Sequence, residues 1–335
     1  EDQSIYRFRG ADLRNILDFE RDYPACRVVR LEQNYRSTKR ILDIASSVIA
    51  HNYGRKGKTL WTENAEGEPA SLYRAWDEHE EAGFVRRTIE AQHHRGADYR
   101  EIAIFYRTNA QSRVLEDALR QSGIPYLIVG GVRFYERKEI KDTLAYLRLV
   151  ANGKDDVAFR RAIAAPHRGI GKASLGRLEE AATALGRSLL EACRALPPEL
   201  GGKPRRSLEE FARLIEDLGA KKTGALLPQI VDEVLIASGY REALRQEKTA
   251  EADERLQNLD ELVAAAEEFQ RSREDATLEG FLDAVSLVSD VDELPEERGA
   301  VTLMTLHSAK GLEFPVVFLT GMEEGVFPHV RSMDD

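Results

Sequence analysis

A block of roughly 160 residues without strand signals, after residue 137, constrains the fold of this chain most strongly. Ser207-Leu-Glu-Glu210 predicts a capping box at the start of one helix in this block, and Pro197-Pro198 with Gly201-Gly202 predicts a loop before it. Acidic residues over 247–297 indicate a solvated face. Helical periodicity runs through 138–151, 156–165, 173–185, 207–218, 226–238, most of 250–273, and 277–289.

Strand and helix patterns alternate on both sides of the helical block. Helical patterns at 39–52, which Thr38 or Ser37 could cap, and at 78–94 and 111–122 separate the early strands, while a short helix over 11–23 ends before Pro24. Apolar runs of strand length occur at 27–31, 70–75, 101–106, 126–129, 301–306 and 314–320. Such alternation implies right-handed crossovers and a parallel sheet covered on both faces. The sequence therefore predicts an α/β parallel-sheet domain interrupted by a mostly α-helical inserted domain.

Size and composition limit the class of protein. With 335 residues, the chain exceeds one ordinary core, and 42% hydrophobic with 32% charged residues is typical of a soluble protein. A net charge of -10 argues against coating nucleic acid but leaves local phosphate contacts open. The sequence has neither a signal peptide nor an apolar run of membrane-spanning length, so we expect a cytoplasmic protein without membrane contact. Cys26 and Cys193 fit neither a disulfide framework nor a metal site.

Two segments approach the pattern of a phosphate-binding loop without meeting it. Gly57-Lys58-Thr59 follows a predicted helix instead of a strand, and Asn52 stands where the partner glycine is needed. Gly169-Ile-Gly171-Lys172 fails because Ala173 follows the lysine. Nor does an apolar strand end in paired Asp-Glu to hold magnesium. We therefore expect that this chain does not hydrolyse ATP by itself.

Polar residues that follow strands are the candidates for ligand contacts. His-Ser-Ala-Lys-Gly-Leu-Glu joins the runs 301–306 and 314–320, as a ligand-contacting loop would at a strand end, although a solvated turn fits the spacing equally well. Arg36 follows the run 27–31 beside Tyr35. A guanidinium offers fixed donors to phosphate oxygens and keeps its charge, which suits a transferring phosphoryl group. A surface ion pair beside a half-buried tyrosine is the alternative.

Five motif blocks resemble the UvrD/PcrA/Rep family of superfamily 1 DNA helicases, in family order. They are EDQSIYRFRG (1–10), LEQNYRS (31–37), YRTN (106–109), FYERKEIKD (134–142) and TLHSAKGLEFPVVFLTGMEEGVFPH (305–329), the last similar to the fifth helicase motif. The resemblance implies a fragment of such a helicase. Residues 1–26 would end the first RecA-like motor domain, 27–136 and 299–335 would form the second, and 137–298 its helical insert. The chain starts without Met, and we expect the phosphate loop upstream and a sixth motif, with a second arginine, downstream.

The resemblance also implies residue roles in an ATP cleft. Arg36 would be an arginine finger on the γ-phosphate, Tyr35 a platform for the adenine, and Glu313 a partner of the ribose. Gln3 would sense the γ-phosphate, and Arg9 would couple the nucleotide to the domain interface. ATP and Mg²⁺ would be bound mainly by the part of the parent protein outside this chain.

Further roles concern DNA. Tyr6 and Phe8 would stack on bases, with Phe8 where relatives often have Trp. Loop backbone and charge at 168–172 would grip duplex phosphates, although a helix connection without function is common. The other implied contacts are Thr305 and His307 of the fifth motif, Arg107, Thr108 and Asn109, for which capping of a strand end is the alternative, and, within 168–172, Arg168, Gly169, Gly171 and Lys172.

The implied parent is an ATP-dependent 3′–5′ DNA helicase of repair or replication, acting on single-stranded DNA and single-strand/duplex junctions. Repair or replication proteins and a second copy of the chain are candidate partners. Two alternatives stay open, a DNA-binding module without catalysis and the motor part of a helicase–nuclease subunit. The pathway, the oligomeric state and the orientation of the insert do not follow from the sequence.

Overall fold

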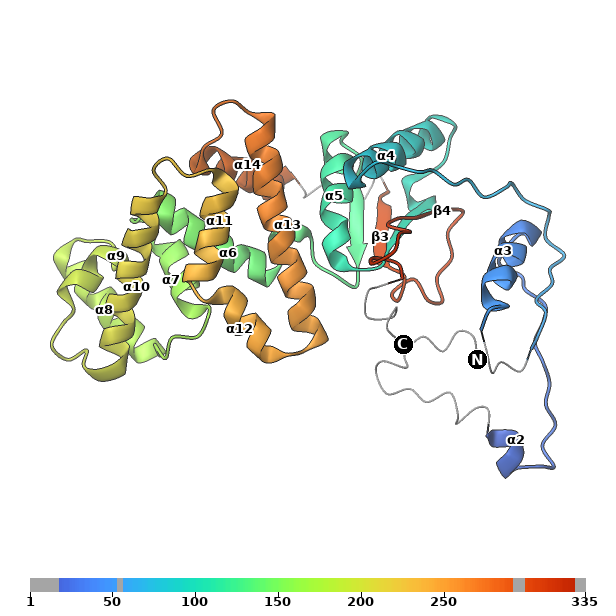
Figure 1. Ribbon diagram of the computed structural model, residues 1–335, viewed down its shortest axis with the longest axis horizontal. Helices are drawn as coiled ribbons and strands as arrows, with labels where there is room; N and C mark the ends of the chain where they lie inside the picture. The colour runs from blue at the N-terminus through green and yellow to red at the C-terminus, as the bar shows by residue number, and fades with distance from the viewer. Residues whose placement is uncertain (1–17, 53–56, 292–298, 329–335) are drawn as a thin grey trace. The chain divides into compact units, whose positions relative to one another are not determined.

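Four strands form one parallel sheet in the computed structural model, which describes residues 18–52, 57–291 and 299–328 (Figure 1). Their order is β2-β3-β1-β4. Ile104 of β1 stands opposite both Leu303 of β3 and Phe318 of β4. Strands from before and after the helical block therefore alternate in one sheet, which confirms the predicted α/β class. The strands are β1 (Ile102–Tyr106), β2 (Tyr126–Val129), β3 (Val301–Thr305) and β4 (Val316–Leu319).

The chain divides into two compact units. The described residues up to Glu81, with Ala309–Glu313, form the smaller unit, and residues from Ala82 to Ser308, with those from Phe314 onward, form the larger one. The sheet and the helical block both belong to the larger unit. Within the described ranges, no helix combines the length and the apolar character needed to pass through a bilayer.

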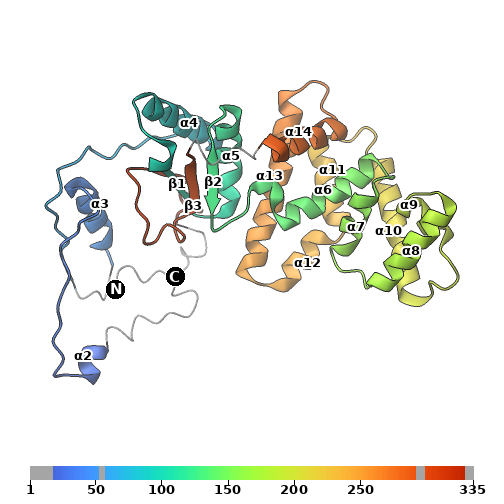
Figure 2. The same ribbon diagram turned by 180° about the vertical axis from the view of Figure 1, so that it is seen from behind.

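Helices α4 (Glu78–His94) and α5 (Ser112–Gln121) lie on one face of the sheet (Figure 1, Figure 2). Because side chains alternate along a strand, Ile104 and Leu303 enter this core while Leu127 and Leu319 point to the other face, where they are 43% and 51% exposed. That face is exposed at the edge strands β2 and β4, whereas Ala103 and Met304, which share it on the central strands, are buried. The connection from β2 to β3 is the helical block, which builds a core of its own.

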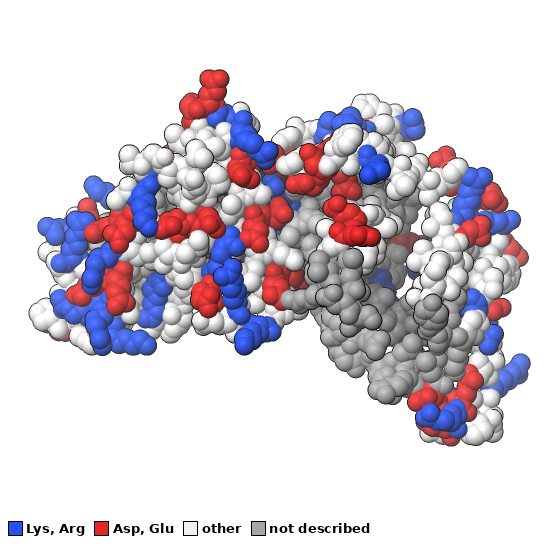
Figure 3. Space-filling view, in the orientation of Figure 1, with Lys and Arg blue, Asp and Glu red and all other residues white. Residues whose placement is uncertain are grey.

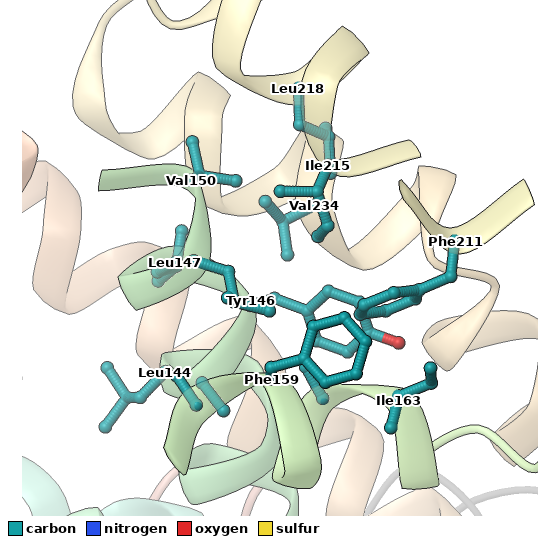
Figure 4. Packing of buried hydrophobic residues seen from close by; sticks show 14 of the residues in the cluster. Leu144, Tyr146, Leu147, Val150, Phe159, Ile163, Phe211, Ile215, Leu218 and Val234 are labelled. Atoms are coloured by element: carbon teal, nitrogen blue, oxygen red, sulfur yellow. The ribbon is translucent and has the colours of Figure 1, made fainter. Parts of the chain in front are cut away.

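The helical block packs around its nearly buried first helix, α6 (Figure 4). Phe211 meets Tyr146 and Phe159 edge to face, with ring centroids 5.9 Å and 5.3 Å away, an arrangement that favours the aromatic quadrupoles. The helical character of this block was correctly expected. The helices are α6 (Lys138–Ala151), α7 (Asp156–Ala164), α8 (Lys172–Leu185), α9 (Leu189–Ala192), α10 (Gly202–Lys221), α11 (Leu227–Ala237), α12 (Tyr240–Glu247), α13 (Ala250–Ser272) and α14 (Leu278–Val291).

Helix α10 begins earlier than its sequence signal. It starts at Gly202 and places Pro204 in its first turn, where a proline costs little because its missing N–H would have no helical partner. Ser207 therefore lies inside the helix, and the predicted capping box is wrong. The Ser207 hydroxyl instead donates to the carbonyl oxygen of Arg168 at 2.9 Å.

The smaller unit contains α2 (Phe19–Asp22) and α3 (Lys39–Ile49). Of the helix predicted over 11–23, only α2 falls within the described residues. The strands expected at 27–31 and 70–75 are not formed, although both segments are described. Among the described residues of the smaller unit, strand pairing is limited to a single parallel bridge between Gln33 and Trp61, and Leu31 is 80% exposed. Without a neighbouring strand, the apolar run has no ladder to join.

Candidate functional site

Arg36 and Glu313 meet in the smaller unit although they lie 277 residues apart in sequence. The Arg36 Nε donates to Glu313 Oε2 at 2.8 Å, and Nη2 lies 3.5 Å from the carbonyl oxygen of Gly311. Both side chains are exposed, at 48% and 69%. A guanidinium has five N–H donors, so this contact orients the group and leaves further donors for an anionic ligand.

Two asparagines shape the backbone around Arg36. Asn34 Oδ1 accepts hydrogen bonds from the N–H groups of Arg36, at 3.0 Å, and Ser37, at 2.8 Å. Asn64 approaches the same loop from another segment and donates to two of its carbonyl groups. Asn34 lies in the LEQNYRS block but had no role assigned to it, and Asn64 is an isolated loop residue without a periodic signal.

Tyr35 stands beside this arginine with its ring in solvent. It is 78% exposed, and its hydroxyl donates to Gln33 Oε1 at 2.9 Å. An exposed ring held by its hydroxyl offers a face on which a planar base could stack. The other predicted nucleotide contacts, Gln3 and Arg9, lie outside the described residues, as do the predicted stacking residues Tyr6 and Phe8.

The carboxyl ends of the parallel strands gather several predicted DNA contacts in the larger unit. Arg107 Nη1, just after β1, lies 3.1 Å from both ring nitrogens of His307, just after β3. Thr305 Oγ1 lies 3.0 Å from the hydroxyl of Ser308. Gly130, at the end of β2, has φ +73°, and a Cβ there would lie 2.9 Å from that hydroxyl oxygen. Glycine is required where the chain turns this close to a neighbour.

Thr108 and Asn109 also have a local structural role. Gln111 Oε1 accepts from the N–H groups of Arg107 and Thr108, each at 3.0 Å, and Thr108 is the N-cap residue of the short 3₁₀ helix η3 (Asn109–Gln111). The alternative of a capped strand end therefore describes this turn, and the side chains of Arg107 and His307 are the ones brought together.

In the loop between α7 and α8, the residues predicted to contact DNA fall into two groups. Arg168 turns inward, where Nη2 donates to the Tyr146 hydroxyl at 2.7 Å and to the Ser238 carbonyl at 3.1 Å. Its guanidinium also lies over the Phe211 ring, 5.4 Å from the centroid. The structure thus gives Arg168 internal partners in place of the outward position expected for a phosphate contact.

Gly171 and Lys172 of the same loop are exposed, and Gly169 adopts φ +73°. Lys203, near the start of α10, lies alongside, since its Cε would be 3.3 Å from a Cβ on Gly169. Figure 3 shows Lys and Arg side chains, interspersed with acidic ones, over this α8–α10 end of the block. Local positive charge therefore exists here despite the net charge of -10.

A parallel sheet interrupted by a helical block, together with the motif residues at its strand ends, defines a RecA-like helicase domain. The family model described as UvrD-like helicase C-terminal domain matches residues 29–335, and the UvrD/REP helicase N-terminal domain matches residues 1–24. The chain therefore belongs to the UvrD-like helicase family.

Three similar proteins are each named ATP-dependent DNA helicase PcrA. The protein from Bacillus subtilis (strain 168) is 49% identical over 340 residues, and that from Staphylococcus aureus (strain Mu50) is 48% identical over 335 residues. The Staphylococcus epidermidis protein is 47% identical over 335 residues. Each comparison covers 99% of this chain but 46% of the relative, so the chain spans about half the length of the relatives it matches.

Proposed function

We propose that the complete protein to which this chain belongs is an ATP-dependent DNA helicase that moves 3′ to 5′ on single-stranded DNA and unwinds duplexes. In this proposal, the chain supplies the arginine-finger side of the ATP cleft, and the sheet-end and α7–α8 loops contact DNA. The contact between Arg36 and Glu313 carries the proposal, because it pairs the cation suited to a γ-phosphoryl group with a carboxylate that fixes its direction.

The residues of the smaller unit fit the chemical parts of ATP. The Arg36 guanidinium can donate to phosphate oxygens, and the exposed ring of Tyr35 can stack on the adenine. Glu313 accepts from Arg36 through Oε2, and its other carboxylate oxygen can accept from a ribose hydroxyl. Bound ATP supplies the phosphoryl group that is transferred to water. We expect Mg²⁺ to be held mainly by the part of the complete protein that this chain does not include.

Arg36 acts by electrostatic stabilisation in this mechanism. Negative charge spreads over the γ-phosphoryl oxygens as the bond to the leaving group breaks, and a guanidinium already aimed at them needs no reorganisation. Glu313 and the loop backbone hold the direction of that group. Arg107, His307 and Lys172 would bind the DNA backbone and bases without reading sequence. On its own, the chain is expected to bind DNA without hydrolysing ATP.

Arg36→Ala in the full-length protein tests this function. We expect DNA-stimulated ATP turnover to fall by about 10³-fold, because arginine fingers contribute on this order, while the affinity for ATP changes little. Steady-state ATPase rates and titration with a non-hydrolysable ATP analogue measure the two quantities. Arg21→Ala is the control, since Arg21 is an exposed arginine of the same unit that pairs with Asp18 at 3.0 Å. Unchanged turnover in Arg36→Ala would remove Arg36 from the mechanism.

A further inference from the structure

A second segment of the smaller unit, Trp61–Gly67, runs alongside the Arg36 loop and is called the brace here. Its backbone pairs with the loop before Arg36, where Trp61 N donates to Glu32 O at 3.0 Å and Asn34 N donates to Trp61 O at 2.7 Å. After Arg36, Lys39 N donates to the carbonyl oxygen of Ala65 at 3.2 Å. The brace therefore contacts the loop on both sides of the arginine.

Asn64 lies in the middle of the brace. Its Nδ2 donates to the carbonyl oxygens of Tyr35 and Ser37, each at 3.1 Å, and these residues flank Arg36. A side-chain amide has two N–H donors, so one residue can hold both carbonyls at once. The Asn64 backbone N–H in turn donates to Thr62 Oγ1 at 3.1 Å, and Thr62 is buried. Asn34 thus holds the N–H groups of both peptides that adjoin Arg36, and Asn64 holds the carbonyl groups of both neighbouring residues.

The brace is itself held against the start of α3. Thr38 occupies the N-cap position of this helix but makes no side-chain capping bond. Instead, Ala65 and Glu66 supply carbonyl oxygens to the first N–H groups of α3, so they satisfy donors that a helix leaves without partners. Gly67 has φ +79°, and a Cβ there would lie 2.4 Å from Thr38 Oγ1. This close approach leaves the brace little room to shift along the loop.

We propose that Asn64 is a positioning residue for Arg36: it holds the carbonyl groups of Tyr35 and Ser37, the residues on either side of the arginine, so that the guanidinium meets the phosphoryl group in the productive direction. The inference rests on the proposed function. It follows from the requirement that a catalytic group be held within a fraction of an ångström by residues that do not touch the substrate. Asn64 has no such part in the motif resemblance.

Asn64→Ala and Asn64→Asp in the full-length protein test the positioning role. The aspartate has nearly the same shape, but it replaces the donor by a charged acceptor that faces two carbonyl oxygens. We expect both variants to lower the kcat for ATP hydrolysis by about 10- to 100-fold, the scale of a misplaced catalytic group, with the affinity for a non-hydrolysable ATP analogue nearly unchanged. Asn152→Asp, at an exposed asparagine of the helical block, is the control.

A double-mutant comparison separates positioning from a general loss of structure. If Asn64 acts through Arg36, Asn64→Ala should add no further loss of turnover in the Arg36→Ala background. A further loss there, or full turnover in both Asn64 single variants, would overturn the inference. The outcome for Arg36→Ala alone keeps the two proposals apart. Unchanged turnover in that variant refutes the finger, whereas a large loss with unaffected Asn64 variants refutes only the positioning role.

Discussion

Glu313 contributes little to folding stability, yet we expect it to matter for ATP turnover. Its pair with Arg36 is half in solvent, and exposed pairs of this kind contribute about 0.2–1 kcal/mol to folding. We therefore expect Glu313→Ala to change the free energy of unfolding by less than about 1 kcal/mol. ATP turnover should nevertheless fall clearly, because the Arg36 Nε loses the acceptor that orients it. Urea denaturation and single-turnover hydrolysis measure the two effects.

Glu313→Gln is the informative companion variant, since it keeps an oxygen acceptor for Arg36 Nε and removes only the charge. Its turnover should lie between those of the wild type and Glu313→Ala. Equal losses in both variants would mean that charge, and not the direction of the hydrogen bond, is what Arg36 requires from this residue.

Single residues also mark the limit of sequence analysis. The sequence placed Arg36 and Glu313 on one site through motif resemblance, because both belong to motif blocks. Asn64 was not predicted, because its role depends on the carbonyl groups of Tyr35 and Ser37, which it contacts only in the folded loop. Arg168 had the charge expected of a phosphate contact, but the direction of its side chain follows from the Tyr146 and Phe211 rings that pack beneath it.

Among the secondary-structure elements, Arg168 connects the α7–α8 loop to three other helices. Its guanidinium contacts Tyr146 of α6, Phe211 of α10 and the carbonyl of Ser238, directly after α11. We expect Arg168→Ala to destabilise the protein by about 2–3 kcal/mol, because the charged guanidinium loses its hydrogen bonds to the Tyr146 hydroxyl and the Ser238 carbonyl. Urea denaturation of the full-length protein measures this loss.

Lys172 of the same loop leads to a different prediction, which concerns DNA binding instead of stability. Lys172 is exposed, so Lys172→Ala should leave stability unchanged and lower the salt dependence of duplex binding by about one released ion. Arg168→Ala should keep the salt dependence of the wild type even where affinity falls. Binding titrations over a series of salt concentrations distinguish the two. A reduced slope for Arg168→Ala would place its guanidinium on a phosphate in the complex.

Helices were predictable from the sequence where their apolar positions repeat over several turns. The long helices α4 and α13 repeat their apolar positions over several turns, so their ranges followed from the sequence. The four-residue α9 and the eight-residue α12 were missed because they complete too few turns. The apolar runs at 27–31 and 70–75 resemble strands in composition alone. Composition does not supply the neighbour that a strand needs.

At the scale of the whole chain, a polar contact joins the sheet to the helical block within the larger unit. Arg113 of α5 is only 2% exposed, and its Nε lies 3.0 Å from Glu261 while Nη1 lies 3.2 Å from Glu268, both on α13. Nearby, Arg137 Nη1 donates to Asn258 Oδ1 of α13 at 2.8 Å. The acidic residues of α13 were expected to form a solvated face. No periodic or motif signal pairs these residues with Arg113, from which Glu261 and Glu268 are separated by 148 and 155 residues.

Glu116, on α5 near this contact, should make stability depend on pH. Its carboxylate is 5% exposed and accepts from the Ser112 hydroxyl at 2.5 Å and the Phe134 N–H at 3.2 Å, with Arg137 Nη2 at 3.8 Å. Burial outweighs these contacts and raises the pKa of Glu116 from 4.5 to about 7. The folded protein therefore holds a proton that the unfolded chain releases, so stability is full below the unfolded pKa and declines as pH rises through the folded one.

Glu116→Gln isolates this effect, because the amide keeps the shape and one acceptor of the protonated acid. Wild-type unfolding free energy should fall by about 3 kcal/mol relative to Glu116→Gln between about pH 5 and about pH 8, since one unit of pKa corresponds to about 1.4 kcal/mol. Glu180→Gln, at an exposed glutamate of α8, should follow the wild type at every pH. Parallel curves for the wild type and Glu116→Gln would mean that Arg137 keeps Glu116 charged throughout. The contribution of Glu116 to the free energy of unfolding would then not change with pH in this range.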